Sequence, residues 1–165
     1  MTFYEGMGGL FELAIISVKN TEFTVTSEVE LKDDRSNGVI VAQGGRFGGW
    51  AIFMKDGKPV YEHNFFGQER YKASSNEAVP AGKHSIVFHF KPDDPKKLGS
   101  GGKGVLSVDG KQVAEVQTPK MVYGVFSFDD GLGIGVDDET NVSLDYKEGD
   151  NAFTGKISKV TISVK

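Results

Sequence analysis

The sequence of 165 residues contains no cysteine. This absence excludes disulfide bonds, thiolate metal sites and a cysteine nucleophile. Proline is also scarce, with 5 residues against 22 glycines, a combination that predicts many tight turns and an ordered chain. A chain of this length with 38% hydrophobic residues can bury a core of its own, so we expect a single folded domain over residues 1–165.

An excess of positive charge is lacking as well. The 19 Lys and Arg residues are outnumbered by 23 Asp and Glu, which gives a net charge of -4. Binding of a phosphate backbone needs a broad cationic surface, so we expect no nucleic-acid partner. The apolar run from Leu10 to Val18 is interrupted by Glu12 and follows no basic segment, so we expect neither a signal peptide nor a membrane anchor.

No stretch shows a sustained helical period of 3.6 residues, whereas alternation with a period of two recurs. The dipeptides Asp56-Gly57 and Asp109-Gly110 have the composition of type I′ hairpin turns. About ten short strands separated by turns predict an all-β fold, an antiparallel two-sheet sandwich of the jelly-roll kind. The predicted strands cover residues 22–31, 39–42, 50–55, 58–66, 83–91, 105–108, 111–118, 122–128, 132–136 and 153–164.

Two sequence features that often accompany nucleotide binding or catalysis lack the structural context that these functions need. Gly99 to Gly104 matches the glycine pattern of dinucleotide-binding loops, but the segment leads into a predicted strand and not into a helix, so we interpret it as a flexible hairpin loop. The three histidines, His63, His84 and His89, are expected to be isolated strand residues, with His84 and His89 on opposite faces. We expect no cofactor.

Acidic residues gather near the C-terminus, at positions Asp129, Asp130, Asp137, Asp138, Glu139 and Asp145. Carboxylates on the loops of a sandwich can bind Ca²⁺, but the spacing of a calcium-binding helix–loop–helix motif is absent. We favour a solvated acidic surface over a calcium site and predict no metal.

Aromatic residues and two of the three arginines surround two turns of the predicted sandwich. These residues are Arg46, Phe47 and Trp50 near the first turn, and Phe65, Phe66, Arg70 and Tyr71 near the second. Such a set suits a sugar face, a sulfate group or a protein interface. The alternative, held equally, is that Trp50 and the phenylalanines belong to the core and that the arginines only satisfy loop carbonyl groups. The candidate contact residues are Arg46, Trp50, Phe66, Arg70 and Tyr71.

The same region carries a family resemblance. The run from Asn37 to Trp50, its continuation through Lys55-Asp56-Gly57-Lys58, and the segment from Asn64 to Tyr71 resemble the C-terminal domain of large bacterial arylsulfatases. Looser similarity extends over residues 2 to 164. The resemblance implies a fold similar to a laminin-G or concanavalin-like jelly roll, appended to a catalytic sulfatase domain. The sulfatase segment Cys/Ser-x-Pro-x-Arg has no counterpart in this sequence, so the resemblance implies no sulfatase activity for this chain.

We therefore expect a non-catalytic accessory domain of an arylsulfatase-like protein, one that packs on the catalytic domain or acts alone. The parent protein would be periplasmic or cytoplasmic. The alternative is a free-standing carbohydrate-binding module whose arginines and aromatic rings hold a glycan. A third interpretation, a hydrolase with an acidic pair drawn from Glu62, Asp109 and Asp129, ranks last because no spacing selects a pair.

Overall fold

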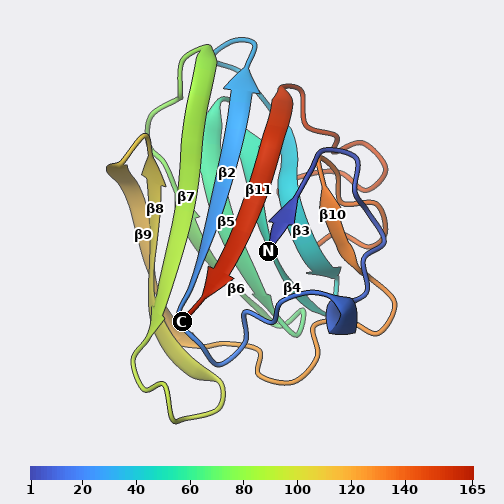
Figure 1. Ribbon diagram of the computed structural model, residues 1–165, viewed down its shortest axis with the longest axis vertical. Coiled ribbons are helices and arrows are strands. Elements are labelled where there is room, and N and C mark those ends of the chain that lie inside the picture. The colour runs from blue at the N-terminus through green and yellow to red at the C-terminus, as the bar shows by residue number, and fades with distance from the viewer.

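Two antiparallel β-sheets pack face to face in the computed structural model, which describes residues 1–165 (Figure 1). Sheet A contains, in spatial order, β1 (Thr2–Phe3), β11 (Lys156–Val164), β2 (Phe23–Leu31), β7 (Gly82–Pro92), β8 (Ser100–Val108) and β9 (Lys111–Lys120). Sheet B contains β10 (Leu132–Ile134), β3 (Gly38–Gly45), β4 (Gly48–Lys55), β5 (Lys58–Phe65) and β6 (Glu69–Ser74). The helical content is one 3₁₀ turn, η1 (Glu12–Ala14). The predicted all-β antiparallel sandwich is confirmed.

The core lies between the two sheets. Alternate residues of β2 and β7 point inward, as their period of two predicts. Sheet B contributes Trp50 and Tyr61, and the Tyr61 ring stacks on Phe88 of sheet A. Aromatic rings of this size account for a large share of the apolar surface that folding removes from water.

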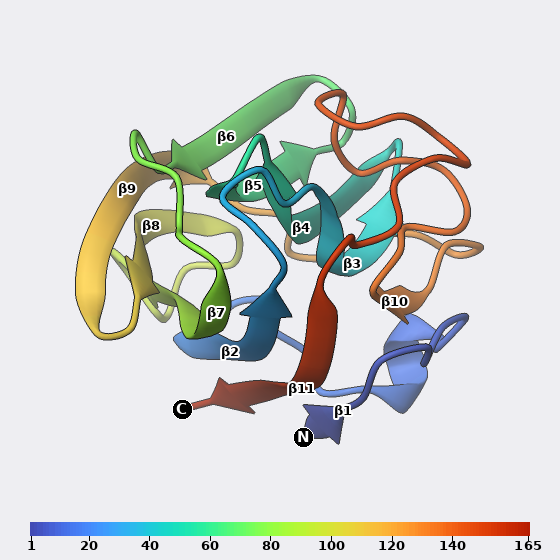
Figure 2. The ribbon, with the colours of Figure 1, turned by 90° about the horizontal axis from the view of Figure 1, so that it is seen from above.

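The central strands of sheet B, β3 to β5, are buried on both faces, because a long segment covers the face that points away from sheet A. Val142 and Tyr146 belong to this covering segment, residues 137–151, and pack on the outer face of the sheet. The Tyr146 ring meets Phe53 edge to face, with the ring centroids 5.0 Å apart. Figure 2 shows the connection between β10 and β11, in orange to red, over the outer side of β3 and β4. Residues 39–42 of β3 are accordingly buried on both faces.

Both predicted hairpin turns are confirmed. Asp56 and Gly57 have φ angles of 50° and 78°, and Asp109 and Gly110 have φ angles of 50° and 82°. Two successive positive φ angles are the signature of a type I′ turn, whose twist matches that of the flanking strands.

The glycine-rich segment before residue 105 is not a flexible loop, and that prediction was wrong. Ser100 to Gly104 form the first half of β8 and pair with β7 and β9. A Cβ atom on Gly101 would lie 2.0 Å from the carbonyl oxygen of Thr118, and one on Gly104 would lie 2.4 Å from the Phe88 ring. Glycine is needed here for close packing within a sheet, a role that composition does not separate from loop flexibility.

The strand predicted over residues 122–128 is also absent. The amide groups of this segment are bound by side chains and not by a neighbouring strand. Val122 N donates to His63 Nε2 at 3.2 Å, and Phe126 N donates to Glu12 Oε2 at 2.8 Å. Because Glu12 and His63 are distant in sequence, local alternation of residues could not show this arrangement.

Candidate functional site

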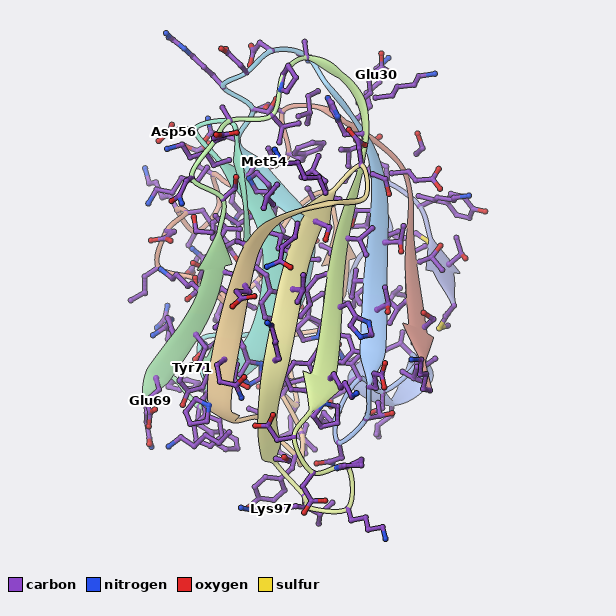
Figure 3. All side chains as sticks on the ribbon, turned by 90° about the vertical axis from the view of Figure 1, so that its left-hand side faces the viewer. Glu30, Met54, Asp56, Glu69, Tyr71 and Lys97 are labelled. Carbon is purple, nitrogen blue, oxygen red and sulfur yellow. The ribbon has the colours of Figure 1, made fainter.

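Four of the five candidate contact residues lie at one end of sheet B. The β3–β4 turn carries Arg46, and the β5–β6 loop carries Phe66. Asn64 joins the two turns: its Nδ2 donates to the carbonyl oxygens of Gly45 and Arg46 at 2.9 Å each, and its Oδ1 accepts from Gly67 N at 2.8 Å. We call this region, with Arg46, Phe47, Phe66, Arg70 and Tyr71, the turn end of sheet B. Figure 3 shows Tyr71 and Glu69 at this end and Asp56 at the opposite end.

Two aromatic rings of the turn end are exposed. Phe47 is 73% exposed and Phe66 is 38% exposed. Phe66 adopts a φ of 52°, a left-handed conformation that a bulky residue rarely takes, and its ring meets Phe65 edge to face with centroids 4.7 Å apart. An exposed ring on a strained backbone is typical of a functional contact.

The polar groups of the turn end already have partners within the chain. Arg46 pairs with Glu148 at 3.1 Å, and both side chains are exposed. The Tyr71 hydroxyl donates to Glu69 at 2.6 Å, and Glu69 also pairs with Lys120 at 2.6 Å. A ligand that recruits Arg46 would therefore compete with an exposed ion pair, which contributes little to stability and is readily exchanged.

Trp50 lies in the core, so it is removed from the set of surface contacts. Its side chain is 1% exposed, and its Nε1 donates to Gln43 Oε1 at 2.9 Å. The alternative that placed this residue in the core applies to Trp50 but not to Phe47 or Phe66. The indole faces inward because β4 alternates, and Trp50 pairs with Gln43 on the inner face.

Arg70 belongs to a buried ionic cluster beneath the covering segment. Glu62 is fully buried, and its Oε1 lies 3.2 Å from Arg70 Nε. Its other oxygen lies 3.5 Å from Lys72 Nζ and accepts a hydrogen bond from Ser143. Lys72 also pairs with Asp145 at 2.8 Å. Burial raises the pKa of Glu62, although these cations oppose the shift.

The three acids of the hydrolase interpretation are not brought together. Glu62 is buried in β5, Asp109 lies in the β8–β9 turn of sheet A, and Asp129 lies in the loop before β10. Asp109 accepts from Ser85 N and faces His84 at 2.7 Å. Glu62, Asp109 and Asp129 therefore do not form the pair of carboxyl groups across a cleft that glycoside hydrolysis requires.

All three histidines have hydrogen-bond or ion-pair partners within the chain. Burial lowers the pKa of His63 to about 3, so this imidazole is neutral near pH 7 and accepts from Val122 N. His84 lies between Asp109 and the carbonyl oxygen of Pro80, and His89 lies between Thr24 and Glu22.

The acidic stretch is only partly a solvated surface. Asp129, Asp138 and Glu139 are exposed, whereas Asp137 is 5% exposed and Asp130 is partly buried. Asp130 accepts from Thr140 N at 3.0 Å and from Ser127 Oγ at 2.7 Å. Asp137 accepts from Val142 N at 2.9 Å and from the Tyr146 hydroxyl at 2.5 Å. These two carboxylates fix loops, a role that the positions of the acidic residues in the sequence do not reveal.

No group of three or more His, Asp or Glu side chains is arranged to hold a metal ion. We predict that millimolar Ca²⁺ or a chelator leaves the melting temperature unchanged, since a bound ion would stabilise the folded state by mass action. Differential scanning fluorimetry with and without EDTA measures this. A rise in melting temperature with calcium that is lost in Asp138→Asn would contradict the prediction.

Asp137 predicts a pH dependence of stability. Burial raises its pKa from 3.8 to about 6, so the folded state binds this proton more tightly than the unfolded state does. The contribution of this group to the free energy of unfolding therefore increases as the pH falls from about 6 toward about 4, by on the order of 2 kcal/mol. Urea denaturation at pH 7 and pH 5 tests this, with Asp137→Asn as the comparison. An identical pH dependence in the variant and the parent chain would refute the assignment.

Comparisons with known proteins identify the fold. No protein-family model matches the chain, and no curated protein matches it in sequence. Among solved structures, it is similar to domains LG4-5 of the mouse laminin α1 chain, with a TM-score of 0.58, 18% identity, and coverage of 99% of this chain and 41% of that chain. It therefore spans less than half of that laminin chain.

Carbohydrate-binding domains are similar to the chain as well. The CBM40 domain of the Ruminococcus gnavus IT-sialidase matches with a TM-score of 0.62, 14% identity, and coverage of 99% of this chain and 91% of that chain. The same domain bound to α2,3-sialyllactose matches with a TM-score of 0.59, 14% identity, and coverage of 88% and 78%. These likenesses establish a laminin-G-like jelly roll and do not show a link to arylsulfatases. No helix in the chain is long and apolar enough to span a bilayer.

Proposed function

We propose that the chain is a non-catalytic accessory module of an arylsulfatase-like protein, which packs against a catalytic domain in cis or in trans. The turn end of sheet B is the proposed contact, with Arg46, Phe66, Arg70 and Tyr71 at or near it. The observation that carries the proposal is the pair of exposed rings, Phe47 and Phe66, held on two clamped turns beside an exchangeable arginine. Aromatic residues and arginine are enriched at protein interfaces and supply most of their binding energy.

Binding to an arylsulfatase catalytic domain that lacks its own C-terminal module tests the proposal. Isothermal titration calorimetry should detect a complex, and Phe66→Ala together with Phe47→Ala should weaken it by at least about tenfold. Leu144→Ala is the matched control, because Leu144 is an apolar side chain that is 75% exposed on the covering segment and belongs to neither turn. The isolated chain should not hydrolyse a fluorogenic sulfate ester. Turnover, or a complex indifferent to both phenylalanines, would contradict the proposal.

A second candidate function is glycan binding, and the likeness to a CBM40 domain bound to sialyllactose favours it. Arg46 would have to leave Glu148 in order to pair with a sugar carboxylate bidentately. Titration with α2,3- and α2,6-sialyllactose tests this candidate. Binding that is lost in Arg46→Gln and kept in Leu144→Ala would favour glycan binding as the function. The absence of binding would contradict this candidate and leave the accessory module as the proposed function.

A further inference from the structure

A second surface lies beside the turn end and has a different chemistry. Four exposed apolar side chains, from Phe11, Leu13, Val125 and Phe128, line a groove of about 180 Å³ between η1 and the segment before β10. Their exposed fractions are 67%, 96%, 37% and 86%. Together they present about 500 Å² of apolar surface, a patch size that is often functional on a monomer. We call this surface the apolar groove.

The groove is firmly built. Glu12, between Phe11 and Leu13, is buried and accepts from Phe126 N at 2.8 Å, which holds the two walls of the groove together. Lys19 neutralises Glu12 and lies 4.7 Å from the centroid of the Phe126 ring. The buried ion pair thus fixes the position of four apolar side chains that are exposed to water. No residue of the chain covers them.

The surroundings of the groove are acidic. The segments that line it and lead to its rim, residues 2–18 and 122–146, contain no Lys or Arg, and the adjacent Lys19 pairs with Glu12. The exposed carboxylates of Asp129, Asp138 and Glu139 form no ion pair. Asp138 lies against the segment that leads to the groove, since a Cβ atom on Gly8 would be 3.0 Å from its Oδ2. Burial, and to a lesser extent the neighbouring Asp130, raise the pKa of Glu139.

From this combination we infer that the apolar groove docks a cationic amphipathic polypeptide segment, whose apolar side chains enter the groove while its Lys or Arg residues face Asp129, Asp138 and Glu139. The complement of an apolar patch with an acidic rim is an apolar anchor with basic flanks. The inference depends on neither function proposed above, because it uses other residues.

Other occupants fit this surface less well. A second copy of the chain docked through the same groove would bring two acidic rims together, and about 500 Å² per partner is below the roughly 800 Å² of a standard interface. Anionic lipids and nucleic acids would be repelled by the same carboxylates. A single helix or extended segment needs only a groove of this size.

Fluorescence anisotropy with a defined probe tests the inference. The probe is a labelled peptide with leucines on one helical face and lysines on the other, and the comparison peptide carries glutamates in place of the lysines. The lysine peptide should bind and the glutamate peptide should not. Raising NaCl from about 50 mM to about 300 mM should weaken binding severalfold.

Variants of the chain assign the binding to the groove. Leu13→Ser with Phe128→Ser should raise the Kd for the lysine peptide by at least about tenfold, and Asp138→Asn with Glu139→Gln should raise it by about threefold or more. Leu144→Ser removes another exposed apolar side chain, outside the groove, and should leave the Kd unchanged. Melting temperatures should stay the same, because the exchanged side chains face solvent.

Several results would overturn the inference: no binding of the lysine peptide, binding that survives Leu13→Ser with Phe128→Ser, or equal binding of the glutamate peptide. Sedimentation showing a dimer that these two substitutions abolish would identify a second copy as the occupant. Capture by anionic vesicles that depends on Phe128 would identify lipid. Because Phe47 and Phe66 are untouched, binding to a sulfatase domain is tested separately.

Discussion

Replacing Trp50 by alanine should lower the free energy of unfolding by about 3 to 5 kcal/mol. The indole is 1% exposed between the sheets, and its removal leaves a cavity and an unpaired Gln43 side chain that is itself 1% exposed. Phe47→Ala is the matched control: this ring is 73% exposed, and its loss should change stability by less than about 0.5 kcal/mol.

Urea denaturation followed by circular dichroism measures both variants. A loss below about 1 kcal/mol for Trp50→Ala would contradict a core position, because exposed side chains rarely contribute more than this. The same pair of variants also separates stability from binding. Phe47→Ala should weaken the proposed complex without unfolding the module.

Replacing Arg70 by methionine should cost about 2 to 4 kcal/mol near pH 7, because it removes a cation from a fully buried carboxylate. Methionine keeps most of the volume of the arginine stem, so the loss of stability reflects the removed charge more than lost packing. Arg46→Met is the control, since the pair of Arg46 with Glu148 is exposed to water and salt. It should leave stability within experimental error.

The cost of Arg70→Met should shrink as the pH falls toward about 5. Burial already raises the pKa of Glu62, and loss of the arginine raises it further, so the buried group then takes up a proton and no longer needs a cation. A loss that is equal at both pH values would contradict this mechanism. Arg70 thus has a structural role in the turn end. Binding measurements on its variants have to be interpreted together with the stability of those variants.

Several features of this protein follow from the sequence alone. Alternation in residues 22–31 and 83–91 predicts β2 and β7, because side chains of a strand point to opposite faces whatever the strand pairs with. The dipeptides Asp56-Gly57 and Asp109-Gly110 predict their turns, because positive φ angles at two successive positions are a local requirement. The sandwich itself follows from many such strands and turns without helical periodicity.

The tertiary structure determined which of these residues are exposed and which are buried. Trp50 and Phe47 stand three residues apart with similar chemistry, but Trp50 points inward from β4, whereas Phe47 lies in the β3–β4 turn and is exposed. The segment over residues 122–128 alternates like a strand, yet Glu12 and His63 take its amide groups and leave it as the wall of a groove. Asp137 and Asp138 are adjacent acids, but only Asp137 meets the Val142 amide and the Tyr146 hydroxyl. In each case the outcome depends on a residue distant in the sequence or on the conformation of a loop. The local sequence pattern predicts neither.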